Sequence, residues 1–223
     1  MFERWYGSAL FDPVFFWIGG AVFVVALATR MPFLQGFLVL GAFEILADAT
    51  LTGPWSPVPS VPALAASVPV LFVILGDARF FVLVTRARRG RLDGRALLGA
   101  AALAFVVPVA SYIPQLAFPT AFASPRNVFL LYEAMFLAFA TALRVWLPSR
   151  LPDASRRWIL RVAELEIAQY TLWIVADLVI VSGADAGYLL RLVPNAIYYV
   201  FFLPFVAWTA PRDLAEPWSR ARA

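Results

Sequence analysis

The stretch Leu64-Ala-Ala-Ser-Val-Pro-Val-Leu-Phe-Val-Ile-Leu-Gly-Asp77-Ala-Arg79-Phe-Phe-Val-Leu-Val84 decides the fold class. An α-helix of about 20 apolar residues spans the hydrocarbon core of a membrane. Asp77 and Arg79 interrupt this apolar run near its middle. A charge at the centre of a membrane helix costs roughly 2.5–3.5 kcal/mol if it faces lipid. We therefore predict a transmembrane helix whose charged side chains face the interior of a bundle.

The composition extends this prediction to the whole chain. Of its 223 residues, 62% are hydrophobic and 14% are charged, whereas soluble domains have about 45–50% apolar and about 25% charged residues. We expect an all-α polytopic membrane protein that forms a single transmembrane domain over residues 1–223. Its seven predicted spans are Pro13–Thr29, Phe33–Leu51, Leu64–Val84, Ala96–Pro114, Val128–Trp146, Trp158–Val181 and Gly187–Trp208.

The basic residues predict the orientation, because arginines concentrate in cytoplasmic loops. Three arginines would lie outside, namely Arg4, Arg126 and Arg191. The arginines of the other loops and of the tail would lie inside: Arg30, Arg86, Arg88, Arg89, Arg91, Arg95, Arg144, Arg150, Arg156, Arg157, Arg161, Arg212, Arg220 and Arg222. This asymmetry predicts an outside N-terminus and a cytoplasmic C-terminus, which requires an odd number of spans. It explains the net charge of +4 by contact with lipid, so no nucleic-acid partner is expected.

Three absent residue types restrict the chemistry. The chain has no Cys and no His, which excludes thiolate nucleophiles and haem or metal sites with Cys or His ligands. It also has no Lys, which excludes a covalent Schiff base to retinal or pyridoxal phosphate. We therefore expect no cofactor. An Ala-rich chain with only arginine as basic residue is typical of a GC-rich genome, so we expect a bacterial inner membrane.

The first and fifth spans align without gaps and suggest a duplication. Five of about 18 aligned positions are identical between the segments 13–30 and 127–144, where roughly two matches are expected by chance. The second and sixth spans share Ala-Asp, at Asp48 and Asp177. A parallel 3+1+3 plan would make residues 13–85 and 127–209 the repeats and residues 96–114 the linker helix.

This layout resembles the architecture of SWEET and PQ-loop transporters and, more distantly, that of microbial rhodopsins. The resemblance implies that Asp77 and Asn195, on the third helix of each repeat, line a substrate cavity. Pro114-Gln115 lies at the end of the fourth span rather than in the first helix of a repeat. Tyr199 stands where rhodopsins carry their retinal lysine, so the resemblance implies no covalent retinal here.

Charged and polar residues inside the spans are the candidate site. They cluster in the middle and outer parts of five spans and must face protein or water. We expect them to line a central, acidic cavity that opens outward and binds a cationic or polyhydroxy solute or carries protons. The alternative is a buried pairing network that fixes helix register, for example Arg79 with Asp48 or Glu133. The candidate residues are Glu44, Asp48, Asp77, Arg79, Glu133, Asp177, Arg191, Asn195 and Tyr198.

Four classes of function are compatible with these features. The layout and the buried carboxyl groups favour a small-solute transporter whose partners are membrane lipid and a small-molecule ligand. The same cavity would serve a seven-helix ligand sensor or a retinal-free opsin-like protein. A membrane enzyme acting on lipids or isoprenoids would use two carboxyl groups as acid and base. A structural subunit of a larger complex would use the charges for folding alone.

Overall fold

The computed structural model describes residues 1–8, 14–29, 34–53, 56–89 and 93–211. All secondary structure in these residues is helical, which confirms the predicted all-α class. The elements are α1 (Phe2–Tyr6), α2 (Val14–Ala28), α3 (Gln35–Thr52), η1 (Val58–Ser60), α4 (Pro62–Arg89), α5 (Gly94–Ala104), α6 (Val106–Ala117), α7 (Pro125–Trp146), η2 (Pro148–Arg150), α8 (Asp153–Val181), α9 (Ala186–Ala196), η3 (Ile197–Phe201) and α10 (Phe202–Thr209).

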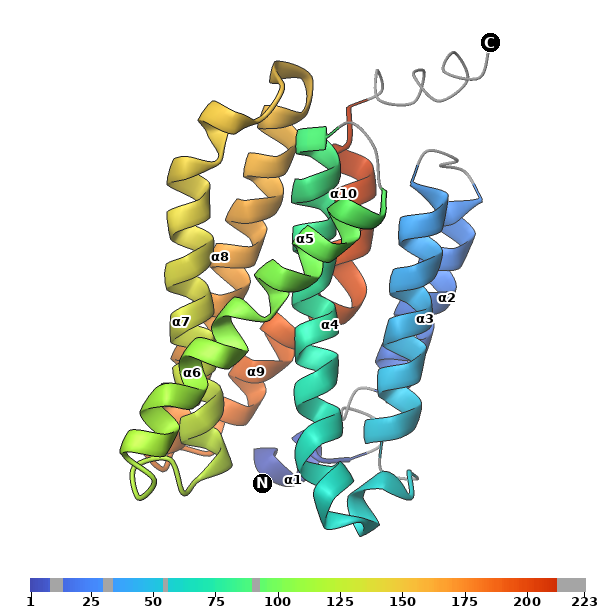
Figure 1. Ribbon diagram of the computed structural model, residues 1–223. Helices are drawn as coiled ribbons and strands as arrows, with labels where there is room; N and C mark the ends of the chain where they lie inside the picture. Colours follow the sequence, from blue (N-terminus) through green and yellow to red (C-terminus); the bar gives the residue numbers. More distant parts are fainter. Residues whose placement is uncertain (9–13, 30–33, 54–55, 90–92, 212–223) are drawn as a thin grey trace.

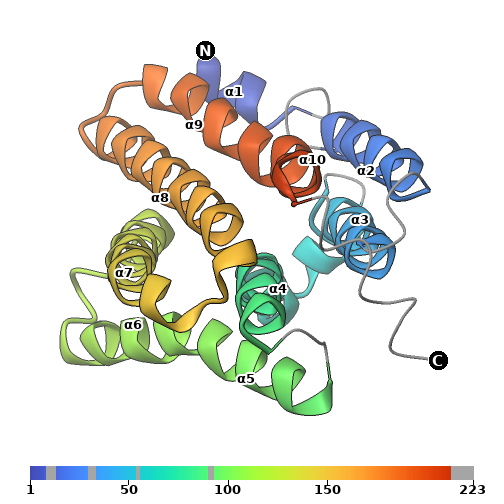
Figure 2. The same cartoon turned by 90° about the horizontal axis from the view of Figure 1, so that it is seen from above.

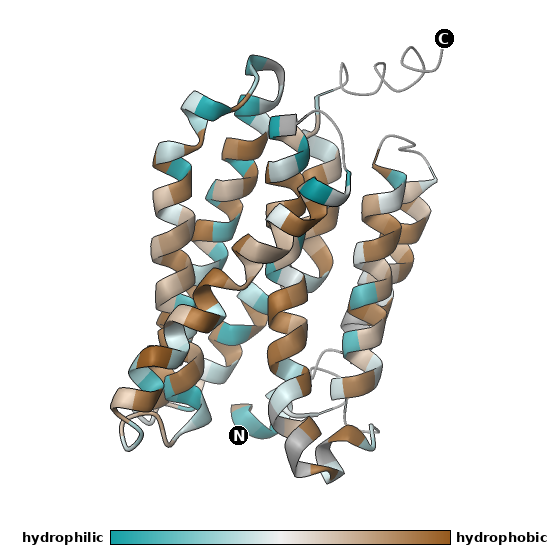
Figure 3. Cartoon of the chain, in the orientation of Figure 1, coloured by the Kyte–Doolittle hydropathy of each residue, from teal (hydrophilic) through white to brown (hydrophobic). Residues whose placement is uncertain are grey.

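Five helical segments are long and apolar enough to cross a membrane, so the chain is a multi-pass membrane protein. They are Gln35–Thr52, Ser67–Arg88, Gly94–Ala117, Pro125–Trp146 and Ala186–Thr209. Large apolar side chains such as Phe43, Leu98 and Val145 are exposed on their outer faces, where lipid would cover them. Hydrophobic residues dominate the helices, and hydrophilic positions interrupt α3 part-way along its length (Figure 3).

The other two predicted spans correspond to α2 and α8. Helix α2 has 15 residues, Val14–Ala28, all of them apolar. By contrast, α8 has 29 residues, or about 43 Å at 1.5 Å per residue. Acidic side chains reduce the hydropathy of α8, but Glu166 and Asp177 are buried. These two charges therefore face the bundle interior.

The helices form a bundle in which α4 occupies a central place (Figure 2). Helix α4 packs against α3, α5 and α8, while α7 and α9 flank α8 and α2 covers α3 and η3. Figure 1 shows α1 at one end of the bundle, whereas α10 ends at the opposite one. Aromatic side chains fill much of the interior, including Phe80, Phe81, Phe136 and Phe202.

Two helices deviate from regular geometry close to Pro108 and Pro194. The predicted span Ala96–Pro114 divides into α5 and α6 at Phe105. Pro108 cannot donate a hydrogen bond to the carbonyl of Ala104, and its ring crowds that carbonyl. Pro194 lies inside α9, which continues as the π-helical turn η3.

Some predicted positions lie outside the described residues. They are Pro13 and Phe33, at the starts of the first and second predicted spans, and the arginines Arg30, Arg91, Arg212, Arg220 and Arg222. The described residues do not test the predicted duplication or the predicted count of seven spans, so both stay predictions.

Candidate functional site

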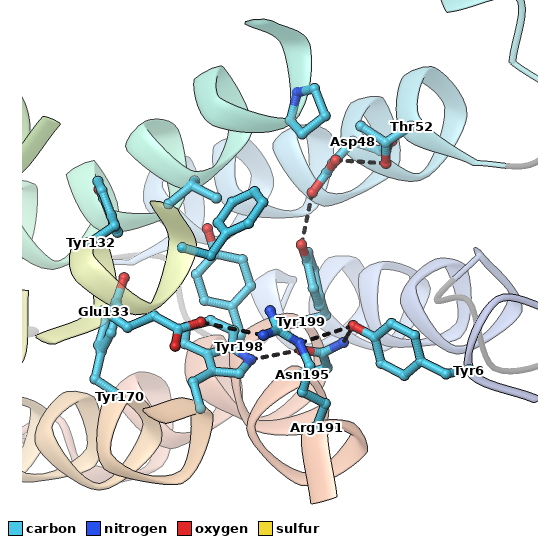
Figure 4. Close-up of a pocket in the computed structure, with 14 residues that line it drawn as sticks. Tyr6, Asp48, Thr52, Tyr132, Glu133, Tyr170, Arg191, Asn195, Tyr198 and Tyr199 are labelled. Atoms are coloured by element: carbon cyan, nitrogen blue, oxygen red, sulfur yellow. Dashed lines mark hydrogen bonds and ion pairs between the residues drawn. The ribbon is translucent and has the colours of Figure 1, made fainter. Parts of the chain in front are cut away.

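A cavity of about 180 Å³ lies inside the bundle, toward the end where α1 is located (Figure 4). Its walls come from α1, α3, α4, α7, α8, α9 and η3, so segments distant in sequence build it together. It is lined by Tyr6, Asp48, Thr52, Pro69, Val73, Phe129, Tyr132, Glu133, Tyr170, Trp173, Arg191, Asn195, Tyr198 and Tyr199. Aromatic rings therefore dominate its surface, and Asp48 and Glu133 contribute two carboxyl groups.

Asp77 lies behind two tyrosines that line one side of the cavity. The Asp77 side chain is 1% exposed. The hydroxyl of Tyr132 donates to its Oδ2 and the hydroxyl of Tyr170 donates to its Oδ1. Both tyrosines line the cavity, so Asp77 holds α7 and α8 against α4 and fixes the positions of two wall residues. We call Asp77, Tyr132 and Tyr170 the floor.

An arginine-centred network lies on the α9 side of the cavity. Arg191 Nη1 donates to Asp177 and lies 3.4 Å from Glu133 Oε1. Arg126 Nη1 donates to Asp177 Oδ1 at 3.2 Å. Two arginines and two carboxylates therefore pair here, as expected for charges buried in a membrane bundle.

Amide and phenol groups extend this network to α1. Trp173 Nε1 donates to Asn195 Oδ1 at 2.8 Å, and Asn195 Nδ2 donates to the Tyr6 hydroxyl at 3.0 Å. Arg191 Nε also donates to the Tyr6 hydroxyl, at 3.3 Å. Tyr6 thus connects α1 to two residues of α9 and points into the cavity from one edge (Figure 4).

Asp48 faces the cavity from α3. Its carboxylate accepts hydrogen bonds from Thr52 Oγ1 and from the Tyr199 hydroxyl, both at 3.0 Å. No arginine in the described part of the chain lies within ion-pair distance of Asp48. Asp48 is therefore a buried carboxyl group held only by neutral donors.

The π-helical turn η3 directs Tyr198 and Tyr199 toward the same cavity. Wide turns of this kind often occur at functional sites. The Tyr198 hydroxyl donates to the Phe72 carbonyl at 3.2 Å and lies where Gly76 has no side chain, since a Cβ there would be 1.3 Å from it. Gly76 thus provides the space that Tyr198 needs.

A wider vestibule of about 660 Å³ adjoins the cavity. The two spaces share Tyr6, Phe129 and Arg191 in their linings, so these three residues lie between them. The rest of its lining comes from the α6–α7 loop, the start of α7, the end of α8 and the start of α9, which places the vestibule at one end of the bundle. The cavity therefore lies next to a space at that end.

The structure brings most of the predicted site residues together. Asp48, Glu133, Arg191, Asn195 and Tyr198 line the cavity. Asp77 and Asp177 lie one layer behind it, in contact with residues that line it.

Glu44 and Arg79 do not line the cavity. They face a separate apolar groove of about 270 Å³ between α3 and α4. The predicted pairing of Arg79 with Asp48 or Glu133 is wrong, because Arg79 Nε lies 3.3 Å from Glu44 Oε2. The guanidinium carbon also lies 4.4 Å from the centre of the Tyr198 ring, which stabilises the cation in this position.

Other polar residues lie near the site. Tyr170 and Trp173 line the cavity, whereas Tyr112 and Gln115 line a neighbouring pocket beside α6. Glu164 pairs with Arg144 at 2.7 Å.

Sequence reasoning missed Tyr6, Thr52 and Phe129. Tyr6 precedes every predicted span, so neither hydropathy nor intramembrane charge marks it. Thr52 and Phe129 lie near span ends and are neutral, which gives no signal distinct from ordinary membrane helices.

The chain matches no protein-family model, and no curated protein or solved structure is found to be similar to it. The function therefore has to be inferred from the cavity itself.

Proposed function

We propose that this chain is a seven-span membrane protein that moves a small cationic or polyhydroxy solute across the membrane. The solute would bind in the aromatic, acidic cavity. One observation carries this proposal: a cavity lined by Asp48, Glu133 and six aromatic rings with polar edges lies within a membrane bundle. A purely structural network would fill this space with paired side chains.

Transport requires a route from the cavity to each end of the bundle. The vestibule, which shares three lining residues with the cavity, would provide the outer route. On the other side of the floor, Glu166 Oε2 and both amide atoms of Gln169 are buried without hydrogen-bond partners in the described structure. Buried polar atoms normally bind water or an ion when protein offers no partner. Glu166 and Gln169 therefore mark a polar inner route, which suits a proton-coupled step.

The proposed topology places the N-terminus outside and the C-terminus in the cytoplasm. Counting α2 and α8 with the five apolar segments gives seven crossings. Arg150, Arg156 and Arg157 lie at the α7–α8 connection, at the end of the bundle opposite α1 (Figure 1). This charge distribution follows the positive-inside rule.

The SWEET-like 3+1+3 plan is part of this proposal. It pairs the third helix of the first repeat, which carries Asp77, with that of the second, which carries Asn195. Asn195 lines the cavity and Asp77 holds its floor, which supports a corresponding role for the two positions.

A thermal-shift screen of the detergent-purified protein tests for a cavity ligand. Sugars, amines, amino acids and isoprenoids would be added at mildly acidic and mildly alkaline pH, with Asp77→Asn in parallel. We expect selective stabilisation by one polar class, reduced in Asp77→Asn because the floor tyrosines lose a charged acceptor. If no compound stabilises the protein and Asp77→Asn only lowers its melting temperature, the charges serve folding and the proposal fails.

A further inference from the structure

We propose that the cavity is selective for a small organic cation that carries N–H donors, and that Glu133 is its specificity-determining residue. This inference rests on the proposed function and narrows its solute class from cationic or polyhydroxy to cationic. The evidence is the state of the hydrogen-bonding groups in the cavity wall.

Five of the six aromatic residues that bring a polar hydrogen to the wall already donate it, and the sixth, Tyr6, accepts from Arg191 and Asn195. A polyhydroxy solute offers both donors and acceptors, so it needs free partners of both kinds. Five aromatic residues of the wall donate their polar hydrogens to protein acceptors: Tyr132 and Tyr170 to Asp77, Tyr199 to Asp48, Tyr198 to the Phe72 carbonyl and Trp173 to Asn195. A polyol would have to displace these bonds, whereas a cation with N–H groups needs only acceptors.

An unfilled acceptor is present in the wall. Glu133 is 4% exposed and lines the cavity. Its Oε1 accepts from Arg191 at 3.4 Å, while its Oε2 has no hydrogen-bond partner in the described residues. Leaving a buried carboxylate oxygen unpaired is unfavourable. A solute N–H group that donates to Glu133 Oε2 would give this oxygen a hydrogen-bond partner.

The charges and rings of the cavity also suit a cation. Asp48, from the opposite wall, brings a carboxyl group without an arginine partner in the described chain. The faces of Trp173 and the tyrosines attract cations within about 6 Å of the ring centre. The volume of about 180 Å³ is below the ~300–1,000 Å³ of drug-sized ligand sites. A small alkylammonium or alkylguanidinium ion suits the carboxyl groups, the aromatic faces and the small volume of the cavity.

Calorimetric titration of the full-length protein in detergent tests this selectivity with three probes. Methylguanidinium carries N–H donors and a permanent charge, tetramethylammonium carries charge without N–H donors, and glycerol is a neutral polyol. We expect methylguanidinium to bind roughly tenfold or more tightly than tetramethylammonium, since a charge-assisted hydrogen bond contributes about that factor. Glycerol should not bind measurably.

Two variants test whether Glu133 and Asp48 bind the cation. Glu133→Gln retains an acceptor for Arg191 but loses the charge, and should weaken methylguanidinium binding roughly tenfold or more. Asp48→Asn should weaken it as well. Glu164→Gln is the matched control, because Glu164 is exposed and pairs with Arg144 away from the cavity. Melting temperatures of all variants show whether each remains folded.

Each contrary result has a defined meaning. Glycerol or another polyol binding in place of methylguanidinium overturns the cation selectivity and leaves a solute-binding cavity. Equal binding of methylguanidinium and tetramethylammonium, or unchanged binding in folded Glu133→Gln, overturns the role of Glu133. Binding of no solute from any class overturns the proposed function together with this inference.

Discussion

Asp77 shows how one residue can shape a membrane cavity without lining it. Its two carboxylate oxygens accept from phenols on two different helices. Hydrogen bonds to a charged group contribute more than neutral ones, at about 1.5–3 kcal/mol each. The carboxylate therefore fixes both rings with a single side chain on α4.

Removing one of these phenols tests the floor. We expect Tyr170→Phe to lower the free energy of unfolding by about 1.5–3 kcal/mol, because the buried Asp77 loses one of its two donors. A lower melting temperature in detergent would show this. Tyr112→Phe is the control, since Tyr112 is exposed on α6 and should tolerate the change; equal melting temperatures for both variants would contradict the floor.

Gly76 tests the placement of Tyr198. A methyl group at Gly76 would lie 1.3 Å from the Tyr198 hydroxyl, and the ring is confined by Arg79 and Trp173. We therefore expect Gly76→Ala to destabilise the protein by about 1–3 kcal/mol.

The control for Gly76→Ala is Gly99→Ala in α5. Its nearest atom beyond the helix backbone is the Thr85 methyl carbon at 3.9 Å. Alanine is a better helix former than glycine by about 0.5–1 kcal/mol. The control should therefore melt at the same or a higher temperature, and a similar loss in both variants would contradict the close approach of Tyr198 to α4.

At the residue scale, the sequence predicts which polar groups are buried better than it predicts their partners. Asp48, Glu133 and Arg191 stand out because charge inside an apolar span must face protein. Arg79 pairs with Glu44 rather than with Asp48, because the rotation of α3 relative to α4 sets the partner. Sequence periodicity does not contain that rotation.

At the element scale, α1 acts as a short strap across the end of the bundle where α8 joins α9. The Asp185 carboxylate accepts from the Met1 amino group at 2.5 Å and from the backbone N–H groups of Phe2 and Glu3 at 2.7 and 2.9 Å. These bonds hold the pKa of Asp185 down at about 2, below its usual 3.8. The strap positions Tyr6 between the cavity and the vestibule.

The lowered pKa of Asp185 predicts the pH range in which α1 stays attached to Asp185. A carboxyl group with a lowered folded-state pKa stabilises the contact above its usual pKa, and the contribution is lost as pH falls through about 2. The strap should therefore be fully attached at neutral pH. Asp185→Asn should release it at neutral pH, seen as faster motion of a spin label at Ser8→Cys.

The control for the strap is Asp153→Asn, which breaks a pair with Arg156 at the other end of the bundle. It should leave the spectrum unchanged. A spectrum of Asp185→Asn identical to that of the unmodified strap would contradict the attachment.

Hydropathy predicted that the long helices exist. Irregularities within them depend on individual residues. Most predicted span ends agree with the structure within a few residues, because apolar runs end where polar or proline-rich segments begin. The division of α5 from α6 at Phe105 depends on Pro108, whereas hydropathy predicts one continuous span there. Helix α1 is too short to give any periodic signal.

At the scale of the whole molecule, the absence of cysteine makes the topology directly testable. We expect Thr120→Cys, in the exposed α6–α7 loop, to react with a membrane-impermeant maleimide on intact cells. Ser149→Cys, at the exposed α7–α8 connection, should react only after permeabilisation. The reverse labelling pattern would contradict the proposed orientation.

Uptake of methylguanidinium into proteoliposomes tests the central claim most directly, because this ion has no neutral form that leaks through lipid near neutral pH. The cavity account predicts saturable uptake above that of protein-free liposomes. It also predicts that Glu133→Gln abolishes the uptake and that Glu164→Gln retains it. Uptake equal to that of protein-free liposomes, with folded protein in the membrane, would contradict transport through this cavity.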